Sequence, residues 1–328
     1  MAERRRKASP ADVAPLLRLP DAPAPKAGSA EWFAGADGLR LRAALFPAKT
    51  PIGSVVISGG RTEFIEKYLE VAAELVGRGY TVLIHDWRGQ GLSTRLLPDR
   101  LRGHAAGYDA FVADHRSLLD AFEERLPKPW IGLSHSMGGC LTALALAKGE
   151  TRYAACIFSA PMWGINGWPR PLAHGAASLM AWLGNSGNYA LKSVDPYSTP
   201  YESERLTHDR KRYDRTRAFI LAQRDLGLGA VTWGWIESSF DAVGWLRRAP
   251  QVAKIKTPLV VLAAGEEQIV DNRSIRRLAA RIPGAKYLEV PGAYHEILME
   301  TDPIRAIFWR EFGALAAQVF SAAISPNA

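Results

Sequence analysis

Short apolar runs alternate with amphipathic segments along most of this chain, and this alternation limits its possible folds more than any other feature. Most of the runs are continuously apolar, which is typical of strands buried on both faces of a parallel sheet. Strand–helix alternation of this kind predicts an α/β fold with a doubly wound, mostly parallel sheet. We expect strands at residues 39–46, 53–58, 80–86, 130–134, 153–161, 258–267 and 286–295.

The segments between these runs carry apolar residues at helical spacing. Residues 60–79 are an example, because their apolar positions repeat with the period of a helix and Gly77 and Gly79 close the segment. Further helices are expected at residues 108–126, 137–149, 273–283 and 303–320.

The alternation is interrupted between about residues 162 and 250, where the strand pattern is lost. We therefore expect a core formed by residues 31–161 and 251–328, with an insertion at 162–250. Residues 1–30 are rich in Pro, Ala and charge, which predicts a flexible N-terminal arm. The insertion contains six of the ten tryptophans, namely Trp163, Trp168, Trp182, Trp233, Trp235 and Trp245.

The net charge of +8 favours contact with anionic surfaces such as membranes and nucleic acids. The basic residues are scattered, however, and the run at 208–217 alternates with Asp209 and Asp214, which suggests a solvated helix face and no nucleic-acid module. No segment reaches the ~18 apolar residues of a transmembrane helix, and the N-terminus lacks the apolar stretch of a secretory signal. We expect a cytoplasmic protein, with peripheral contact to an anionic membrane left open.

The stretch IGLSHSMGGC, residues 131–140, predicts a sharp strand-to-helix turn with Ser136 at its apex. Such a turn holds a nucleophilic hydroxyl clear of the backbone and needs small residues two positions before and after it. The usual pattern is Gly-x-Ser-x-Gly, and here Ser134 replaces the first glycine while Gly138 keeps the second. The alternative is that Ser136 is an ordinary helix N-cap.

A nucleophilic serine needs a base and an acid that orients the base. His295 is the favoured base, because it follows the last strand on a glycine-containing loop at the edge of the sheet where ligands bind. The loop after the preceding strand offers three carboxylates as the acid, Glu266, Glu267 and Asp271, and the first turn favours a glutamate.

The negatively charged intermediate of ester hydrolysis needs two backbone N–H donors. Met137 follows the nucleophile and is the expected first donor. Arg61 is the expected second donor, since Gly59 and Gly60 before it allow close approach of the backbone to a ligand. The Arg61 side chain is also suited to a phosphate or carboxylate.

Taken together, these residues resemble the α/β-hydrolase superfamily, and within it the lysophospholipase and monoacylglycerol lipase branch. The likeness is carried by GGRTEFIEKYLEVAAEL, HDWRGQGLSTRLLPDRLRGH, SHSMGG, EEQIVDNR and GAYHEILME, spread over about residues 53–300. The resemblance implies Ser136 as nucleophile, His295 as base and Glu267 as the acid, where an aspartate is more common. Glu266 remains the alternative acid.

The resemblance also implies that the insertion at 162–250 is a helical cap that holds the acyl chain. Gly60, Trp163 and Trp233 are the residues that we expect to contact substrate. The implied activity is serine carboxylic-ester hydrolysis of single-chain lipid esters, most of all lysophospholipids. Monoacylglycerol lipase, general carboxylesterase or thioesterase activity, and a non-catalytic ligand-binding homologue, are the alternatives.

No organic cofactor or metal is expected. The two cysteines, Cys140 and Cys156, lie in apolar surroundings without a metal-ligand spacing, which predicts buried packing residues and no disulfide framework. The expected partner is a small-molecule lipid ester, without nucleic acid, and the oligomeric state stays open.

Overall fold

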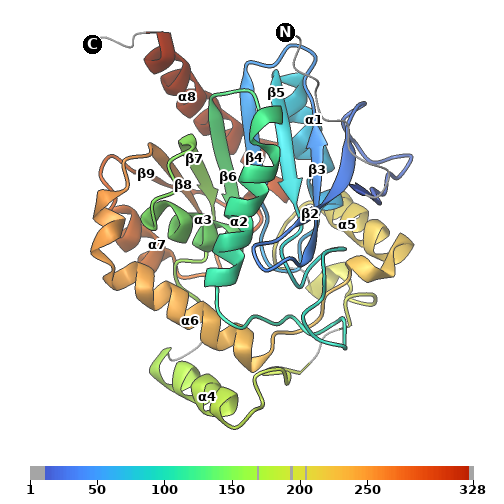
Figure 1. Cartoon of the computed structure of the whole chain (residues 1–328), viewed down its shortest axis with the longest axis vertical. Helices are drawn as coiled ribbons and strands as arrows, with labels where there is room; N and C mark the ends of the chain where they lie inside the picture. Colours follow the sequence, from blue (N-terminus) through green and yellow to red (C-terminus); the bar gives the residue numbers. More distant parts are fainter. Residues whose placement is uncertain (1–11, 168–169, 193–194, 204, 325–328) are drawn as a thin grey trace.

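The structure is a computed structural model that describes residues 12–167, 170–192, 195–203 and 205–324. Its centre is a nine-stranded sheet with the strand order β1-β2-β3-β5-β4-β6-β7-β8-β9 (Figure 1). The strands from β5 to β9 in this order are parallel, and β1, β2 and β3 add antiparallel strands at one edge. The strands are β1 (Val13–Ala14), β2 (Ser29–Ala34), β3 (Arg40–Phe46), β4 (Gly53–Ser58), β5 (Tyr80–His85), β6 (Trp130–His135), β7 (Tyr153–Ser159), β8 (Leu259–Ala264) and β9 (Lys286–Val290).

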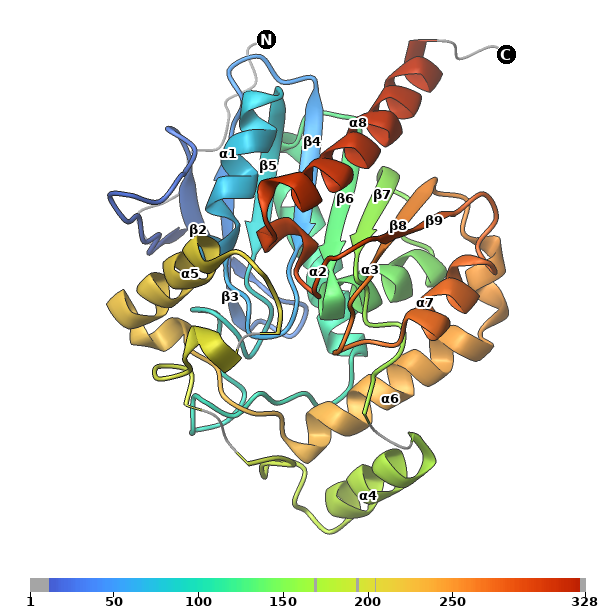
Figure 2. The same cartoon turned by 180° about the vertical axis from the view of Figure 1, so that it is seen from behind.

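Helices cover both faces of the sheet, as the doubly wound prediction requires. Helices α1 (Leu69–Gly77) and α8 (Asp302–Ile324) bury apolar side chains against one face (Figure 2). Helices α2 (Asp109–Phe122), α3 (Ser136–Ala147) and α7 (Asn272–Ala279) pack on the other. The central strands are apolar on both faces, so each face of the sheet needs a layer of helices that shields it from water.

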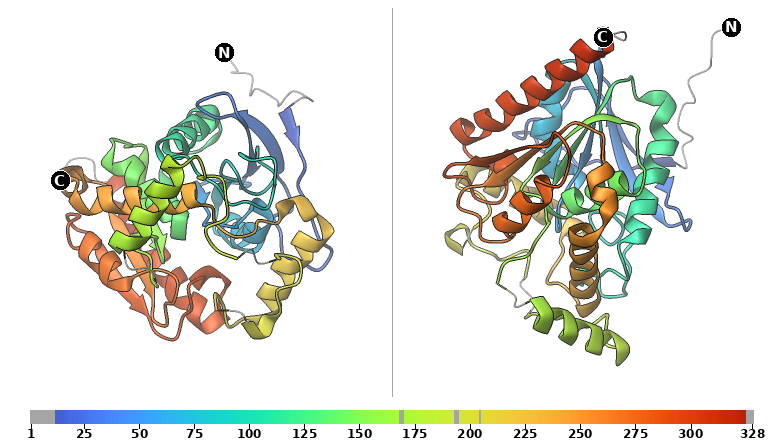
Figure 3. Two further views of the ribbon diagram at one scale, coloured as in Figure 1. Left: turned by 90° about the horizontal axis from the view of Figure 1, so that it is seen from below. Right: turned by 90° about the vertical axis from the view of Figure 1, so that its left-hand side faces the viewer.

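The inserted segment contributes helices and no strand of the sheet among its described residues. Helix α4 (Arg170–Trp182) packs on α6 (Trp233–Arg248) through a small apolar cluster. Helix α5 (Arg210–Ala222) lies over the strand ends on the side away from α6. The views in Figure 3 place α4 beyond the carboxyl ends of the strands. This is the position of a cap, although the division of 162–250 from the core as a separate domain stays a prediction.

A buried ion cluster fixes the antiparallel edge to the parallel sheet. Arg42 of β3 is fully buried, and its Nε donates to Asp86 Oδ2 at 2.7 Å while its two Nη atoms donate to Glu66 at 2.8 Å. Arg42 also donates to the carbonyl of Pro15 at 3.0 Å. A buried charge is tolerated only when it is paired and hydrogen-bonded, so these contacts hold three distant segments together.

Two expectations are wrong in part. The arm predicted at 1–30 is not free from residue 12 onward, because β1 pairs with β2 and the Leu17 N–H donates to Glu66. The run at 208–217 does not form a wholly solvated helix face, because Arg212 is buried. The Arg212 guanidinium forms ion pairs with the carboxylates of Glu70, Asp209 and Asp302. Two of these acids are far away in sequence, so periodicity within the helix does not reveal them.

The first turn of α3 lies unusually close to the sheet. A Cβ atom at Gly138 would lie 2.2 Å from the carbonyl oxygen of Ser58 at the end of β4. A Cβ atom at Gly139 would lie 2.7 Å from Cβ of Pro161. Two consecutive glycines are therefore required where this helix leaves β6.

We expect Gly138→Ala to lower the free energy of unfolding by about 1–3 kcal/mol, because the added methyl group overpacks a backbone contact. Urea unfolding measures the change. Gly77→Ala is the matched control, since Gly77 also lies within a helix but has no neighbouring atom within 4 Å of the added Cβ. Equal stabilities of the two variants would contradict the close approach of α3 to β4.

Candidate active site

Ser136 is the first residue of α3 and directly follows the last residue of β6. Its φ is +48°, a left-handed value that is uncommon for serine, and it is 8% exposed. The hydroxyl of Ser134 bonds the hydroxyl of Thr142 at 2.9 Å, so the residue in place of the first glycine is buried and satisfied. The segment is therefore the strained strand-to-helix turn that the sequence predicts.

The structure brings Ser136, His295 and Glu267 into one hydrogen-bonded chain. His295 Nε2 lies 2.9 Å from Ser136 Oγ, and His295 Nδ1 lies 2.8 Å from Glu267 Oε2. The three residues come from loops or turns after β6, β8 and β9, which end at the same edge of the sheet. The glutamate facing the imidazole is Glu267, whereas Glu266 is exposed.

Asp271, the third carboxylate in this loop, lies at the start of a helix instead of facing His295. It is the N-cap of α7, where it accepts hydrogen bonds from the Arg273 N–H at 3.0 Å and from the Ser274 hydroxyl. Its role is therefore to satisfy the start of a helix.

Glu267 is held in its charged form. Burial alone would raise the pKa of its carboxyl, but the hydrogen bond with His295 and those with the Ile269 and Val270 N–H groups hold this pKa below its ordinary value. An ionised carboxylate only accepts hydrogen bonds, so it fixes the proton of His295 on Nδ1. Nε2 is then the acceptor that faces Ser136 Oγ.

The loop that follows β4 lies directly beside the serine. A Cβ atom at Gly60 would lie 3.1 Å from Cβ of Ser136, so only glycine allows this approach without a shift. Gln90 donates to the Gly60 carbonyl at 3.0 Å and accepts from the Thr62 N–H at 2.9 Å. The Arg61 N–H has no acceptor among the described residues, and it lies between these anchored positions.

Glu63 is a site residue that sequence reasoning missed. Its buried carboxylate accepts hydrogen bonds from the Gly60 N–H and from the Tyr68 hydroxyl at 2.6 Å. Burial would raise the pKa of Glu63, but the ammonium of Lys67 and these hydrogen bonds hold it well below its ordinary value. The only sequence signal is the position of this acid three residues after Gly60.

Glu63, His135 and Glu296 place ligand atoms within 4.8 Å of one another, which raises the question of a metal site. Lys67 Nζ lies 3.0 Å from Glu63 Oε1 and also donates to Glu296. Its ammonium already pairs with both carboxylates and occupies the place of a cation, so this donor set does not fit a metal ion. Lys67 instead links the loop after β4 to the residue that follows His295.

Of the three residues predicted to contact substrate, the structure places one directly against Ser136. Gly60 lies against Ser136 as expected. Trp163 is buried in the core, where its indole N–H donates to the Gly139 carbonyl at 3.2 Å, and Trp233 packs against the apolar cluster of the cap. Trp168, a tryptophan of the expected insertion, lies outside the described residues.

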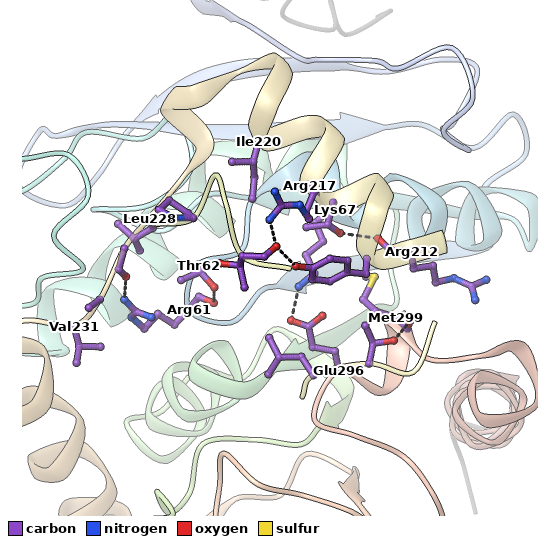
Figure 4. A pocket seen from close by; sticks show the side chains of 18 of the residues that line it. Arg61, Thr62, Lys67, Arg212, Arg217, Ile220, Leu228, Val231, Glu296 and Met299 are labelled. Atoms are coloured by element: carbon purple, nitrogen blue, oxygen red, sulfur yellow. Dashed lines mark hydrogen bonds and ion pairs between the residues drawn. The ribbon is translucent and has the colours of Figure 1, made fainter. Parts of the chain in front are cut away.

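A cavity of about 440 Å³ opens between α5, the cap loops and the loop after β4 (Figure 4). Neither Trp163 nor Trp233 lines it, so their contact with substrate stays a prediction. Apolar side chains make up much of its wall, among them Leu206, Ile220, Leu228, Val231 and Met299. Apart from Met299, which lies in the stretch GAYHEILME, these residues come from segments without a recognisable motif, so no sequence signal identifies them.

Comparison with known proteins identifies the fold family. A family model described as serine aminopeptidase, S33, matches residues 49–302, which is well over half of the 328-residue chain. The chain belongs to this α/β-hydrolase family. It is 34% identical over 291 residues to lysophospholipase L2 of Escherichia coli (strain K12), covering 84% of this chain and 83% of the relative.

Two further relatives agree with this α/β-hydrolase assignment. The chain is 26% identical over 281 residues to a monoacylglycerol lipase of Mycolicibacterium smegmatis, covering 82% of this chain and 91% of that protein. A solved soluble variant of monoglyceride lipase from Saccharomyces cerevisiae matches with a TM-score of 0.69 at 18% identity, covering 90% and 97% of the two chains. The predicted fold and the resemblance to this branch are confirmed.

We expect Glu267→Gln to lower kcat by about 10³–10⁴-fold, because an amide in place of the carboxylate neither fixes the His295 tautomer nor stabilises its charged form. Ester hydrolysis kinetics measure the change. Glu266→Gln, one residue earlier and exposed, is the matched control and should retain activity. A larger loss in Glu266→Gln than in Glu267→Gln would reverse the assignment.

We expect Glu63→Gln to lower kcat by about 10–100-fold with little change in KM, because the loop that carries Arg61 loses its charged anchor and shifts. Steady-state kinetics with a short ester separate the two constants. Glu124→Gln, at an exposed position far from the loop in sequence, is the control. A change in KM alone would show that Glu63 does not position the loop.

Proposed function

We propose that this α/β-hydrolase is a serine carboxylic-ester hydrolase that acts through Ser136. The hydrogen-bonded chain from Ser136 through His295 to Glu267 carries this proposal. His295 Nε2 takes the Ser136 proton as the oxygen attacks the ester carbonyl, and Glu267 stabilises the resulting imidazolium. The N–H groups of Met137 and Arg61 hold the negatively charged oxygen of the intermediate.

Two steps follow, namely release of the alcohol and hydrolysis of the acyl-enzyme. His295 returns its proton to the leaving alcohol, and the acyl group stays on Ser136 as an ester. Water enters, His295 removes a proton from it, and the hydroxide attacks the acyl-enzyme. His295 then returns this proton to Ser136 Oγ as the free acid leaves, which restores the Ser136 hydroxyl and the neutral imidazole.

The substrate class that we propose is a single-chain lipid ester, with a lysophospholipid favoured. The relative with 34% identity is named lysophospholipase L2, and a cavity with both apolar and basic side chains on its wall lies beside the loop of Arg61. Monoacylglycerol hydrolysis is the second candidate, supported by the relative of that name in Mycolicibacterium smegmatis. A general carboxylesterase or thioesterase, and a non-catalytic ligand-binding homologue, complete the candidate functions.

Peripheral contact with an anionic membrane is part of this proposal. Helix α4 exposes Leu172 and Trp182, which are 73% and 82% exposed, and the neighbouring Leu183 is 53% exposed. Leucine and tryptophan on a helix surface favour the lipid–water interface, and the net charge of +8 favours anionic lipids. Within the described part of the chain, no helix has the length and apolar character needed to span a bilayer.

We expect wild type to hydrolyse p-nitrophenyl esters and Ser136→Ala to lose this turnover, because no other group replaces the nucleophile. Ser134→Ala is the matched control, since the Ser134 hydroxyl bonds only Thr142 and should be dispensable for chemistry. A series of acyl lengths then distinguishes a lipase-like enzyme, which prefers long chains, from a small-ester esterase. Equal turnover by wild type and Ser136→Ala on every ester would refute the hydrolase proposal and favour a ligand-binding homologue.

A further inference from the structure

The cavity beside the active site has an excess of positive charge on its wall. Its lining includes five basic side chains and one acidic side chain, Glu296 (Figure 4). The basic residues are Arg61, Lys67, Lys192, Arg212 and Arg217. They fall into two groups that differ in whether the protein itself supplies a carboxylate partner.

In the first group, carboxylates of the protein compensate the positive charges. Lys67 pairs with Glu63 and Glu296, and Arg212 pairs with three carboxylates of the core and of α5. Their charges are used within the fold, so these two residues leave little attraction for a ligand.

The second group has no carboxylate partner among the described residues. Arg217 donates to the carbonyls of Thr199 and Tyr197, the latter at 2.8 Å, and Lys192 is exposed without an ion pair. Arg61 donates one Nη2 hydrogen bond to the Gly229 carbonyl, and its buried Nε has no hydrogen-bond partner. For Arg61, whose Nε is buried, a charge without an acid partner is costly unless a ligand supplies the missing anion, whereas the exposed Lys192 is solvated and accessible to a ligand.

Arg61 connects the cavity to the chemistry. Its backbone follows Gly60, which contacts Ser136, while its guanidinium lies 5.6 Å from the centre of the Trp235 ring. Burial without a compensating acid lowers the pKa of Arg61 to about 10, so its side chain stays positively charged at neutral pH. Arg61 therefore has its backbone beside the residue that contacts Ser136 and its cationic side chain on the wall of the cavity.

We propose that Arg61, Arg217 and Lys192 form a binding site for the phosphate group of a lysophospholipid headgroup. This inference rests on the proposed function, because the phosphate is placed by an ester bound at Ser136. In such a lipid the glycerol unit alone separates the ester from the phosphate, so a cavity that adjoins the Arg61 loop is where the headgroup is expected. Guanidinium groups match phosphate oxygens in charge and in hydrogen-bonding geometry.

A monoacylglycerol lacks the phosphate, so it gains nothing from these three cations. The site therefore predicts a preference between two lipids with the same acyl chain and the same reacting ester. Lysophosphatidylglycerol and 1-monoacylglycerol are such a pair, and the ratio of their kcat/KM values measures the headgroup contribution alone.

The experiment compares this ratio in wild type, Arg61→Gln and Arg217→Gln, with both lipids in neutral detergent micelles. We expect wild type to favour lysophosphatidylglycerol, and each variant to lower the ratio by about tenfold or more, the scale of one lost charge-assisted hydrogen bond. Arg210→Gln is the matched control, because Arg210 lies on the same helix as Arg217 but pairs with Asp214 outside the cavity. Its ratio should equal that of wild type.

Arg61→Gln is expected to affect both esters to some extent, since the backbone of this residue is part of the proposed oxyanion site. The ratio, rather than either rate, is therefore the readout, and Arg217→Gln provides a second variant without a role in chemistry. Ratios within about threefold of wild type in both variants would overturn the headgroup site while leaving ester hydrolysis intact.

Calorimetric titration with sn-glycerol 3-phosphate tests the site without turnover. We expect wild type and Ser136→Ala to bind this probe, and Arg217→Gln to bind it about tenfold more weakly. Absence of binding to wild type would overturn the proposal even if the enzyme hydrolyses esters. Equal binding of inorganic phosphate would also overturn it, because a headgroup site should require the glycerol. Binding of the probe by a chain that hydrolyses no ester would reject the proposed function alone.

Discussion

The contact between the first turn of α3 and the end of β4 is the constraint on which the site depends. Gly138 has no room for a side chain, because a Cβ there would lie 2.2 Å from the Ser58 carbonyl. This contact forces the chain to turn sharply after β6, which places Ser136 at a φ of +48°. The same approach brings Gly60 against Ser136, so nucleophile and donor loop are positioned by one packing event.

Charge organises the surroundings of that turn. Lys67 joins Glu63, which anchors the donor loop, to Glu296, which follows the base His295. Two loops from different strands are thereby tied by one buried cation, whose burial is tolerated because both partners are acids. Arg61 shows the opposite arrangement. Its side chain lies on the wall of the cavity, where it donates to the Gly229 carbonyl and pairs with no acid among the described residues. The protein thus compensates its structural charges and leaves charges at the cavity for a ligand.

Much of the core and of the triad was predictable from local patterns. The apolar run at 53–58 is β4 in full, and the strand at 130–134 differs from β6 only at His135. Motif order placed Ser136, His295 and two glutamates at strand ends on the same edge of the sheet. The family resemblance favoured Glu267 over Glu266, and in the structure Glu267 faces Nδ1 of His295. Arg212 was misjudged because Glu70 and Asp302, its distant partners, are invisible to helical periodicity.

Local patterns in the amino-acid sequence were sufficient to predict the parallel sheet, the turn at Ser136 and the order of the triad residues. These depend on local periodicity and on small residues at fixed spacing, which act through neighbours in the chain. The three-dimensional fold was needed to show that Trp163 packs in the core, that Glu63 anchors the donor loop and that Arg61 lines a cavity. Those outcomes depend on which side chains meet across the fold, and such contacts join residues whose separation along the chain carries no periodic signal.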